Sequence, residues 1–205
     1  MDLFTLAAPI FDLAMKISGH QKILVELGNQ IKKDELQRYS EGRLSKFNLN
    51  QKNFQKNAET ENNKPAVKLL DLGGGTGELA NFLPQNLEVT IVDPSQAMLK
   101  KGKEKDFRQK VKHVEADGAD LPFADQDFDY LTISDALHHF REVEKSLSEA
   151  VRVLKPGGKL YILEFDPTTF FTKVIIFFVY LAGEPVNFYQ PEKLAELMQE
   201  NELKT

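Results

Sequence analysis

Short apolar runs, each closed by Gly, Pro or Asp, alternate with stretches whose apolar positions recur at helical spacing. This alternation is typical of a doubly wound α/β fold, in which helices cover both faces of a parallel sheet. Strands are expected at 66–72, 87–92, 111–115, 128–134 and 159–165. Helices are expected at 78–83, from Gln96 onward, before Lys155 and at 191–201.

The first of these strands leads directly into a glycine cluster. Asp71 stands just before Gly73, Gly75 and Gly77, which alternate along the turn. Glycines allow positive φ and a close approach of the backbone to a ligand, and the amino end of the next helix offers free N–H groups. A dinucleotide-binding G-x-G-x-x-G pattern would require glycine where Glu78 stands. The spacing and Asp71 favour a cationic ligand over a pyrophosphate. An NAD site and a turn without ligand remain alternatives.

A second acidic landmark closes the next strand. Asp93 follows the glycine turn by about twenty residues, where a doubly wound fold places the carboxylate that binds ribose hydroxyls. Ser95 can cap the helix that begins at Gln96. Taken alone, Asp93 is more simply a turn or cap residue. Together with the glycine turn it favours a nucleoside site.

Four motifs in this order resemble class I S-adenosylmethionine (SAM) methyltransferases. The pattern D-x-G-x-G-x-G at 71–77 is similar to their first motif, and the strings at 117–129 and 154–158 are typical of the same family. The resemblance covers residues 66–166 and implies sheet order 3-2-1-4-5, SAM as cofactor and S-adenosylhomocysteine as product. It implies that Asp117 and the Gly118 N–H meet the adenine. The expected cofactor-binding residues are Asp71, Gly73, Gly75, Thr76, Gly77, Asp93, Pro94, Met98, Asp117, Gly118 and Ser134.

The amino-terminal part carries a narrower resemblance. Residues 3–13 and 18–20 are similar to the start of ubiquinone/menaquinone C-methyltransferases, and residues 160–165 resemble their L-x-I-L-E-F strand. Phe11 and Met15 depart from the Tyr and Asn of that family. The resemblance implies a helical cap over the cofactor pocket and a small apolar acceptor, such as a quinone precursor or a lipid-like phenol. Residues 1–64 are then a helical cap with a polar connector or lid at 40–64, and residues 65–205 are the SAM-binding core.

His138 and His139 follow the fourth expected strand at its carboxyl end, where such folds place ligands. The related quinone enzymes have an aromatic-glycine-hydrophobic-Arg-Asn string there. A base would assist methylation of a phenolic ring, so these histidines are the candidate catalytic residues. The alternative is that one of them caps or packs on the following helix. Neighbouring histidines seldom face one point, so no metal site is expected.

The composition further limits which class of methyl acceptor is expected. The net charge is −5 and there is no cysteine. The first disfavours a general nucleic-acid surface, and the second removes the thiolate that pyrimidine C5 methylation uses. Enzymes that methylate an amide or an adenine amino nitrogen usually have an Asn/Asp-Pro-Pro-Tyr/Phe tetrapeptide after the fourth strand, and this chain has none there. A small-molecule acceptor is therefore expected, and no basic leader is seen, which favours a cytoplasmic location.

The most apolar segment, 170–182, is too short to span a bilayer. Core packing, a wall of the acceptor pocket, a dimer face and a shallow membrane contact all remain open for it. The usual carboxy-terminal β-hairpin is not expected, so strand 159–165 should lie at a sheet edge. Segment 170–182 and a second chain are the expected cover, which predicts a homodimer. A SAM-binding sensor or scaffold and an NAD-linked oxidoreductase are the rival functions.

Overall fold

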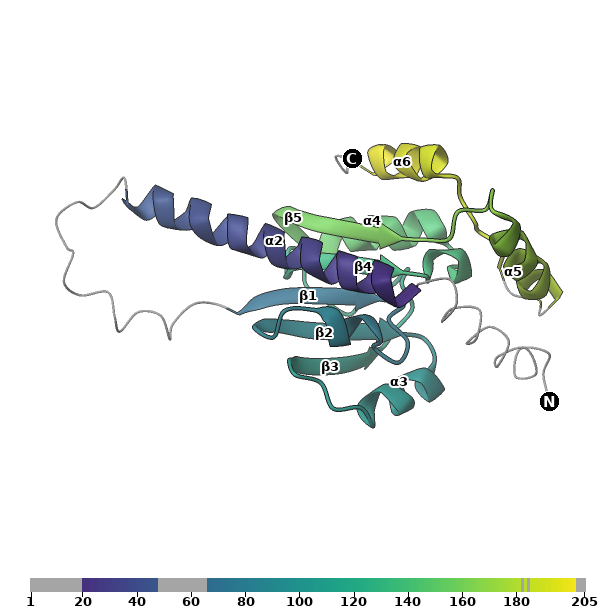
Figure 1. Ribbon diagram of the computed structural model, residues 1–205, viewed down its shortest axis with the longest axis horizontal. Helices are drawn as coiled ribbons and strands as arrows, with labels where there is room; N and C mark the ends of the chain where they lie inside the picture. Colours follow the sequence, from purple (N-terminus) through teal and green to yellow (C-terminus); the bar gives the residue numbers. More distant parts are fainter. Residues whose placement is uncertain (1–19, 48–65, 182, 184, 202–205) are drawn as a thin grey trace.

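Five parallel strands form a single sheet in the computed structural model, which describes residues 20–47, 66–181, 183 and 185–201 (Figure 1). Their order is β3-β2-β1-β4-β5, as predicted. The strands are β1 (Val67–Leu72), β2 (Leu87–Asp93), β3 (Lys110–Glu115), β4 (Phe128–Ser134) and β5 (Leu154–Leu163). Because all five are parallel, their carboxyl ends meet at one edge of the sheet, and that edge carries the predicted site residues.

Helices cover both faces of the sheet, and the apolar residues of the strands divide between them. In β1, Leu69 packs toward one face, whereas Leu70 and Leu72 pack toward the other. All three are almost fully buried, which explains why the strand reads as one continuous apolar run. One face is covered by α2 (His20–Phe47), the 3-10 helix η2 (Leu79–Phe82) and α3 (Gln96–Lys103). The other is covered by η3 (Leu137–His139), α4 (Val143–Val153) and α6 (Pro191–Glu200).

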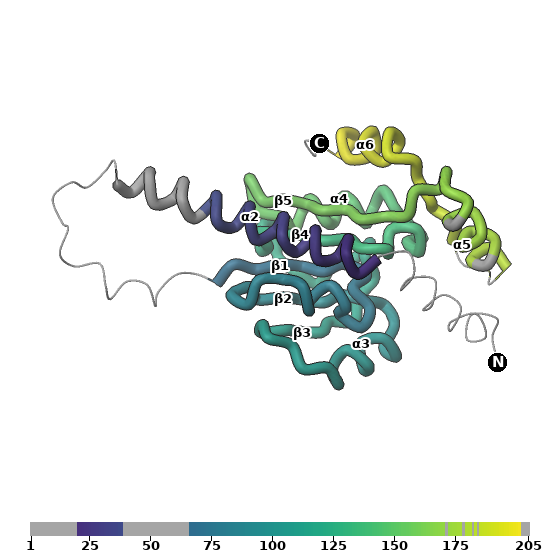
Figure 2. The backbone as a smooth tube through the Cα atoms, viewed as in Figure 1, coloured from purple at the N-terminus to yellow at the C-terminus, as the bar shows by residue number. Residues whose placement is uncertain are grey.

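The helix predicted at 78–83 is wrong in type and length, because only the short η2 forms there. Pro84 disfavours a helical conformation for Leu83, which is extended at φ −78° and ψ 155°. The long helix α2 contacts η2 and lies across this face of the sheet instead (Figure 2). Gly28 permits the crossing, since a Cβ there would lie 2.3 Å from the carbonyl oxygen of Phe82.

Polar contacts also join α2 to the sheet. Asp34 accepts hydrogen bonds from the Tyr161 hydroxyl and from Lys159 Nζ, the latter at 2.9 Å. One turn further along α2, Arg38 pairs with the buried Asp129 at 2.6 Å. The helix continues to Phe47, so the first part of the predicted polar connector is helical. The part of the predicted helical cap before His20 and the rest of the predicted connector, 48–64, lie outside the described residues.

Strand β5 begins five residues earlier than predicted and ends two residues earlier. It includes the L-K-P-G-G segment, where the pairing with β4 jumps from Phe128↔Leu154 to Tyr130↔Lys159. Gly157 takes φ +75° within this irregularity. Glu164 therefore lies just beyond the strand, at the carboxyl edge of the sheet.

The faces of β5 are covered by other elements than those predicted. Leu160 and Ile162 pack against the apolar cluster that includes α4 and α6, and Tyr161 and Leu163 pack against the cluster that includes α2. Segment 170–182, expected as this cover, forms α5 (Phe170–Leu181) beyond the carboxyl ends of the strands (Figure 1). None of the helices in the described part of the chain is long and apolar enough to cross a membrane.

Candidate active site

The glycine turn after β1 has the geometry that its spacing indicates. Gly73, Gly75 and Gly77 all take positive φ, at +73°, +54° and +75°. A Cβ on Gly73 would lie 2.5 Å from the Cβ of Ala136, so this glycine allows the turn to approach the segment after β4. Thr76 accepts a hydrogen bond from Lys105 Nζ at 2.9 Å.

Asp71 is the most unusual group of this turn. Its side chain is buried, and Oδ1 accepts a 2.8 Å hydrogen bond from the Thr132 hydroxyl. Oδ2 has no hydrogen-bond partner among the described residues, and the backbone of Gly74 lies against it. Burial raises the pKa of Asp71 to about 6, and the nearby Asp93 charge adds to this. A cationic amino group would satisfy this oxygen and favour the charged carboxylate.

Asp93 lies beside the turn at the end of β2. Its Oδ2 accepts the Gly75 N–H at 2.9 Å and its Oδ1 accepts the Ser95 N–H at 2.8 Å. A carboxylate can accept about four hydrogen bonds, so capacity remains for two hydroxyl donors. A Cβ on Gly75 would lie 3.5 Å from the Met98 methyl group and 3.8 Å from Asp93 Oδ2. The structure therefore brings Asp71, Gly75, Asp93 and Met98 together, and the exposed Pro94 follows Asp93.

Asp117 and Gly118 lie after β3, at the same edge of the sheet. Asp117 is exposed, and its Oδ1 accepts the Ala119 N–H at 2.9 Å. A Cβ on Gly118 would lie 3.2 Å from Ser146 Oγ in α4, so the loop packs closely on that helix. These contacts hold the loop while leaving the Asp117 carboxylate accessible to an amino donor such as that of adenine.

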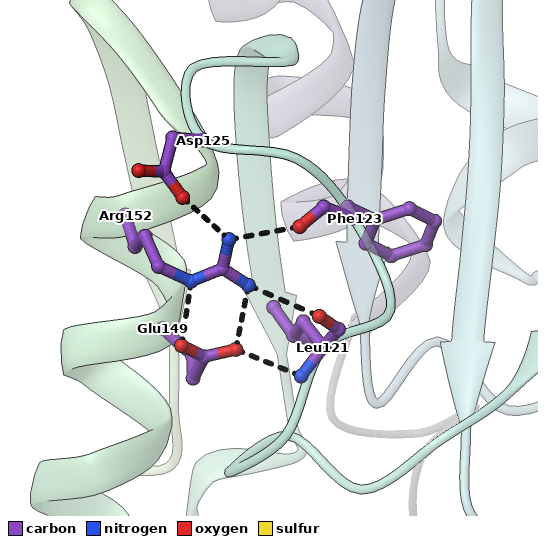
Figure 3. Close-up of polar contacts among 5 residues, drawn as sticks. All are labelled: Leu121, Phe123, Asp125, Glu149 and Arg152. Carbon is purple, nitrogen blue, oxygen red and sulfur yellow. Dashed lines mark hydrogen bonds and ion pairs between the residues drawn. The ribbon is translucent and has the colours of Figure 1, made fainter.

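The loop that continues from Asp117 is held by a residue for which the sequence predicted no role. Arg152 of α4 donates from Nη1 to the Phe123 carbonyl at 2.8 Å and from Nη2 to the Leu121 carbonyl at 3.0 Å (Figure 3). Glu149 pairs with Arg152 and accepts the Leu121 N–H at 2.8 Å. The R-V-L-K-P-G-G string contains this arginine, but only the fold shows that its guanidinium reaches the loop.

The two predicted catalytic histidines differ in environment. His138 is buried, its Nδ1 lies 2.8 Å from Glu164 Oε2, and its ring stacks on Phe188 with 4.4 Å between centroids. His139 is exposed and lies beside it. Glu164 also accepts the Leu137 N–H at 2.6 Å, so one carboxylate fixes both the backbone and the ring at the start of η3.

Asp135 is a second group that sequence reasoning missed. It follows Ser134 at the end of β4 and takes φ +51°, a conformation that is unusual for a residue other than glycine. Its Oδ2 lies 3.2 Å from His20 Nε2, at the first turn of α2. Burial raises the pKa of Asp135 to about 7, and the charge of Glu164 raises it further. The left-handed turn of a non-glycine residue becomes visible only in the structure.

Within the described ranges, no group of three or more His, Asp or Glu side chains could hold a metal ion. The residues at this edge instead provide carboxylates, glycine N–H groups and aromatic rings. They fit a ligand that carries an amino group, ribose hydroxyls and a purine, and SAM carries all three.

Comparison with known proteins agrees with this fit. Residues 70–162 match the sequence profile of a methyltransferase domain family. A ubiquinone/menaquinone biosynthesis C-methyltransferase from Shewanella piezotolerans is 40% identical over 117 residues, which are 53% of this chain and 46% of that protein. The chain thus spans less than half the length of this relative.

Solved structures show the same fold. A SAM-dependent methyltransferase from Thermotoga maritima superimposes with a TM-score of 0.57 at 24% identity, over 69% of this chain and 66% of that one. The phosphoethanolamine N-methyltransferase 2 of Haemonchus contortus, in complex with SAM, superimposes with a TM-score of 0.53 at 27% identity, over 67% of this chain and 33% of that one. Residues 70–162 are therefore similar to a methyltransferase domain, and in sequence they resemble the ubiquinone/menaquinone C-methyltransferases.

Proposed function

We propose that this chain transfers a methyl group from SAM to a small apolar acceptor, such as a quinone precursor or a lipid-like phenol. The observation that carries the proposal is Asp71, a buried carboxylate with an unpartnered oxygen beside the glycine turn. It would repel a pyrophosphate and attract an ammonium group. Bound SAM supplies a methyl group on a positively charged sulfur, which takes the bonding electron pair as the methyl group leaves.

The contribution of the protein is then mainly positional. Rate acceleration of this kind comes from holding the reacting atoms about 3–3.5 Å apart and in line. Gly73 lies against Ala136 and Phe140, so the segment after β4 is next to the cofactor turn. An acceptor bound over this segment lies beside the methionine end of the cofactor.

Three features support an apolar acceptor. Phe165 and Phe188 lie against the ring of His138. In α5, Phe170 is 83% exposed and Tyr180 is 71% exposed, so large apolar side chains are available beyond the carboxyl ends of the strands. Contiguous exposed apolar surface marks a binding site, and α5 is the proposed surface of this kind. The Shewanella relative is named for a quinone pathway, which agrees with this chemistry.

The sequence predicts the proton acceptor of the reaction at the same edge of the sheet. His138 and His139 remain the residues that the sequence predicts for this role. The contacts of His138 with Glu164 and Phe188 favour a fixed wall of the acceptor site, whereas His139 is free to meet the solvent side of an acceptor.

Calorimetry followed by a methyl-release assay tests the proposal. The chain should bind SAM, and it should methylate a prenylated naphthol faster than the short-chain analogue or a polar amine. Phe170→Ser should raise KM for the prenylated acceptor alone, because its side chain is exposed and its loss leaves the core intact. Val186→Ser is the matched control, since Val186 is also exposed and lies outside α5. Equal turnover of the polar amine would rule out the apolar acceptor.

Two rival functions give different results in the same assays. A sensor or scaffold would bind SAM and release no methyl group to any acceptor. An NAD-linked oxidoreductase would bind NAD in preference to SAM, which direct competition between the two ligands would reveal.

A further inference from the structure

Asp135 and Glu164 lie side by side at the carboxyl edge of the sheet. Ser134 and Leu163 are the last register pair of β4 and β5, so the next residues on the two strands are these two carboxylates. Two neighbouring carboxylates in largely buried surroundings repel each other when both are charged. Such a pair therefore binds a proton more readily than an isolated carboxylate does. Glu164 is occupied by Leu137 N–H and His138, which leaves Asp135 as the carboxylate that can exchange a proton with a ligand.

Asp135 is also held in a fixed position. Its backbone N–H donates to the Leu163 carbonyl at 2.8 Å, and His20 Nε2 lies 3.2 Å from its Oδ2. The side chain of Asp135 is 18% exposed and that of His20 is 15% exposed, so neither is sealed from a ligand. Left-handed backbone is strained in a residue other than glycine, and such strain is concentrated at functional sites. The surrounding structure maintains that conformation next to the cofactor turn, because Ala136 lies against Gly73.

We propose that Asp135 removes the acidic proton of the methyl acceptor and that His20 is the residue that positions its carboxylate. This inference rests on the proposed methyl transfer and names the acceptor as a molecule with an ionisable O–H, a phenol or an enol. The acceptor O–H bond breaks, its proton goes to Asp135 Oδ, and its electron pair remains on the acceptor. The acceptor then forms the bond to the methyl group while the electron pair of the sulfur–methyl bond goes to sulfur.

The charges around Asp135 define the expected pH dependence of methyl transfer. Burial and the charge of Glu164, which lies just beyond β5, raise the pKa of Asp135 to about 7, and His20 Nε2 of α2, 3.2 Å from its Oδ2, is placed to donate a hydrogen bond to the charged form. Burial lowers the pKa of His20, so it is neutral where Asp135 is ionised. Methyl transfer should therefore rise as the pH passes about 7 and level off above it.

Asp135→Asn is the direct test, because asparagine tolerates left-handed backbone and matches the shape of aspartate. Single-turnover methyl transfer to a prenylated naphthol should fall about 100-fold or more, the usual contribution of a general base. A nitrated naphthol is already ionised at the assay pH and needs no base. Transfer to it should therefore fall much less. SAM binding by calorimetry should be unchanged. Asp106→Asn, at an exposed carboxylate beyond α3, is the matched control.

A second readout needs no methyl transfer. A naphthol bound in the presence of S-adenosylhomocysteine should show the absorbance of the naphtholate in the wild-type chain and lose it in Asp135→Asn. His20→Phe removes the N–H donor and should move the midpoint of this ionisation to higher pH. Equal losses with both naphthols, or a naphtholate band that persists in Asp135→Asn or disappears in His139→Asn, would overturn the proposal. If the wild-type chain binds SAM and methylates nothing, the proposed function fails, and the absorbance still decides the role of Asp135.

Discussion

The buried Asp71 should make the stability of the ligand-free protein fall as the pH rises. Its pKa is 3.8 in an unfolded chain and about 6 in the folded protein, where burial disfavours the charge. The folded state thus binds this proton more tightly, so the contribution is fully present below about pH 4 and is lost as the pH rises through about 6. The difference corresponds to about 3 kcal/mol in total, of which about 2 kcal/mol falls between pH 4.5 and pH 7.5.

Asp71→Asn isolates this contribution. The amide keeps the bond from the Thr132 hydroxyl but places an unpartnered NH₂ where Oδ2 lies, at a cost of about 1–3 kcal/mol. That cost does not depend on pH in this range, so it cancels when each protein is compared with itself at two pH values. Between pH 4.5 and pH 7.5, the free energy of urea unfolding should therefore fall by about 2 kcal/mol more in wild type than in Asp71→Asn. Asp106→Asn should behave as wild type does.

Binding of SAM should reverse the preference of Asp71 for its neutral form. Its ammonium group favours the charged carboxylate, so binding near pH 6 should release protons, and calorimetry in buffers of different ionisation enthalpy measures that release. Asp71→Asn should bind SAM more weakly and with less proton release. An unfolding free energy whose pH dependence is the same in Asp71→Asn and wild type would refute the argument, because it would mean that the carboxylate does not keep its proton in the folded state.

Other predictions follow from single contacts. Asp93→Ala should weaken SAM binding by about 1.5–3 kcal/mol in calorimetry, the scale for charge-assisted hydrogen bonds. Gly73→Ala should lower the urea-unfolding free energy by about 3 kcal/mol, through strain and its contact with Ala136, whereas Gly157→Ala has open space around it and should lose about 1–2 kcal/mol. Arg152→Lys keeps the charge but loses the planar fork that holds the loop after Asp117, so SAM should bind about 1 kcal/mol more weakly. Arg108→Lys is its exposed control.

The cofactor half of the site could be predicted because its geometry is encoded locally. Each alternating glycine takes a positive φ that few other residues adopt, and Asp71 and Asp93 are fixed by the ends of adjacent strands. The apolar runs likewise predicted the strands, and the family resemblance implied their order in the sheet. The same local reasoning failed for the helix at 78–83, where Pro84 and the packing of α2 decide the outcome. It also failed for β5, because the register jump at Gly157 depends on pairing with β4.

The acceptor half could not be predicted because its parts are far apart in the sequence. His20, Asp135, Glu164 and Phe188 come from the first turn of α2, the ends of β4 and β5, and the segment before α6. No spacing rule joins them, and only the parallel register places Asp135 beside Glu164. This is also where the sequence departs from the quinone methyltransferases, since D-A-L-H-H-F stands in place of their aromatic-glycine-hydrophobic-Arg-Asn string. A chain that keeps the cofactor turn but replaces the groups beside the transferred methyl should share the donor with those enzymes and differ from them in how the acceptor loses its proton. The Asp135 variants test that difference directly.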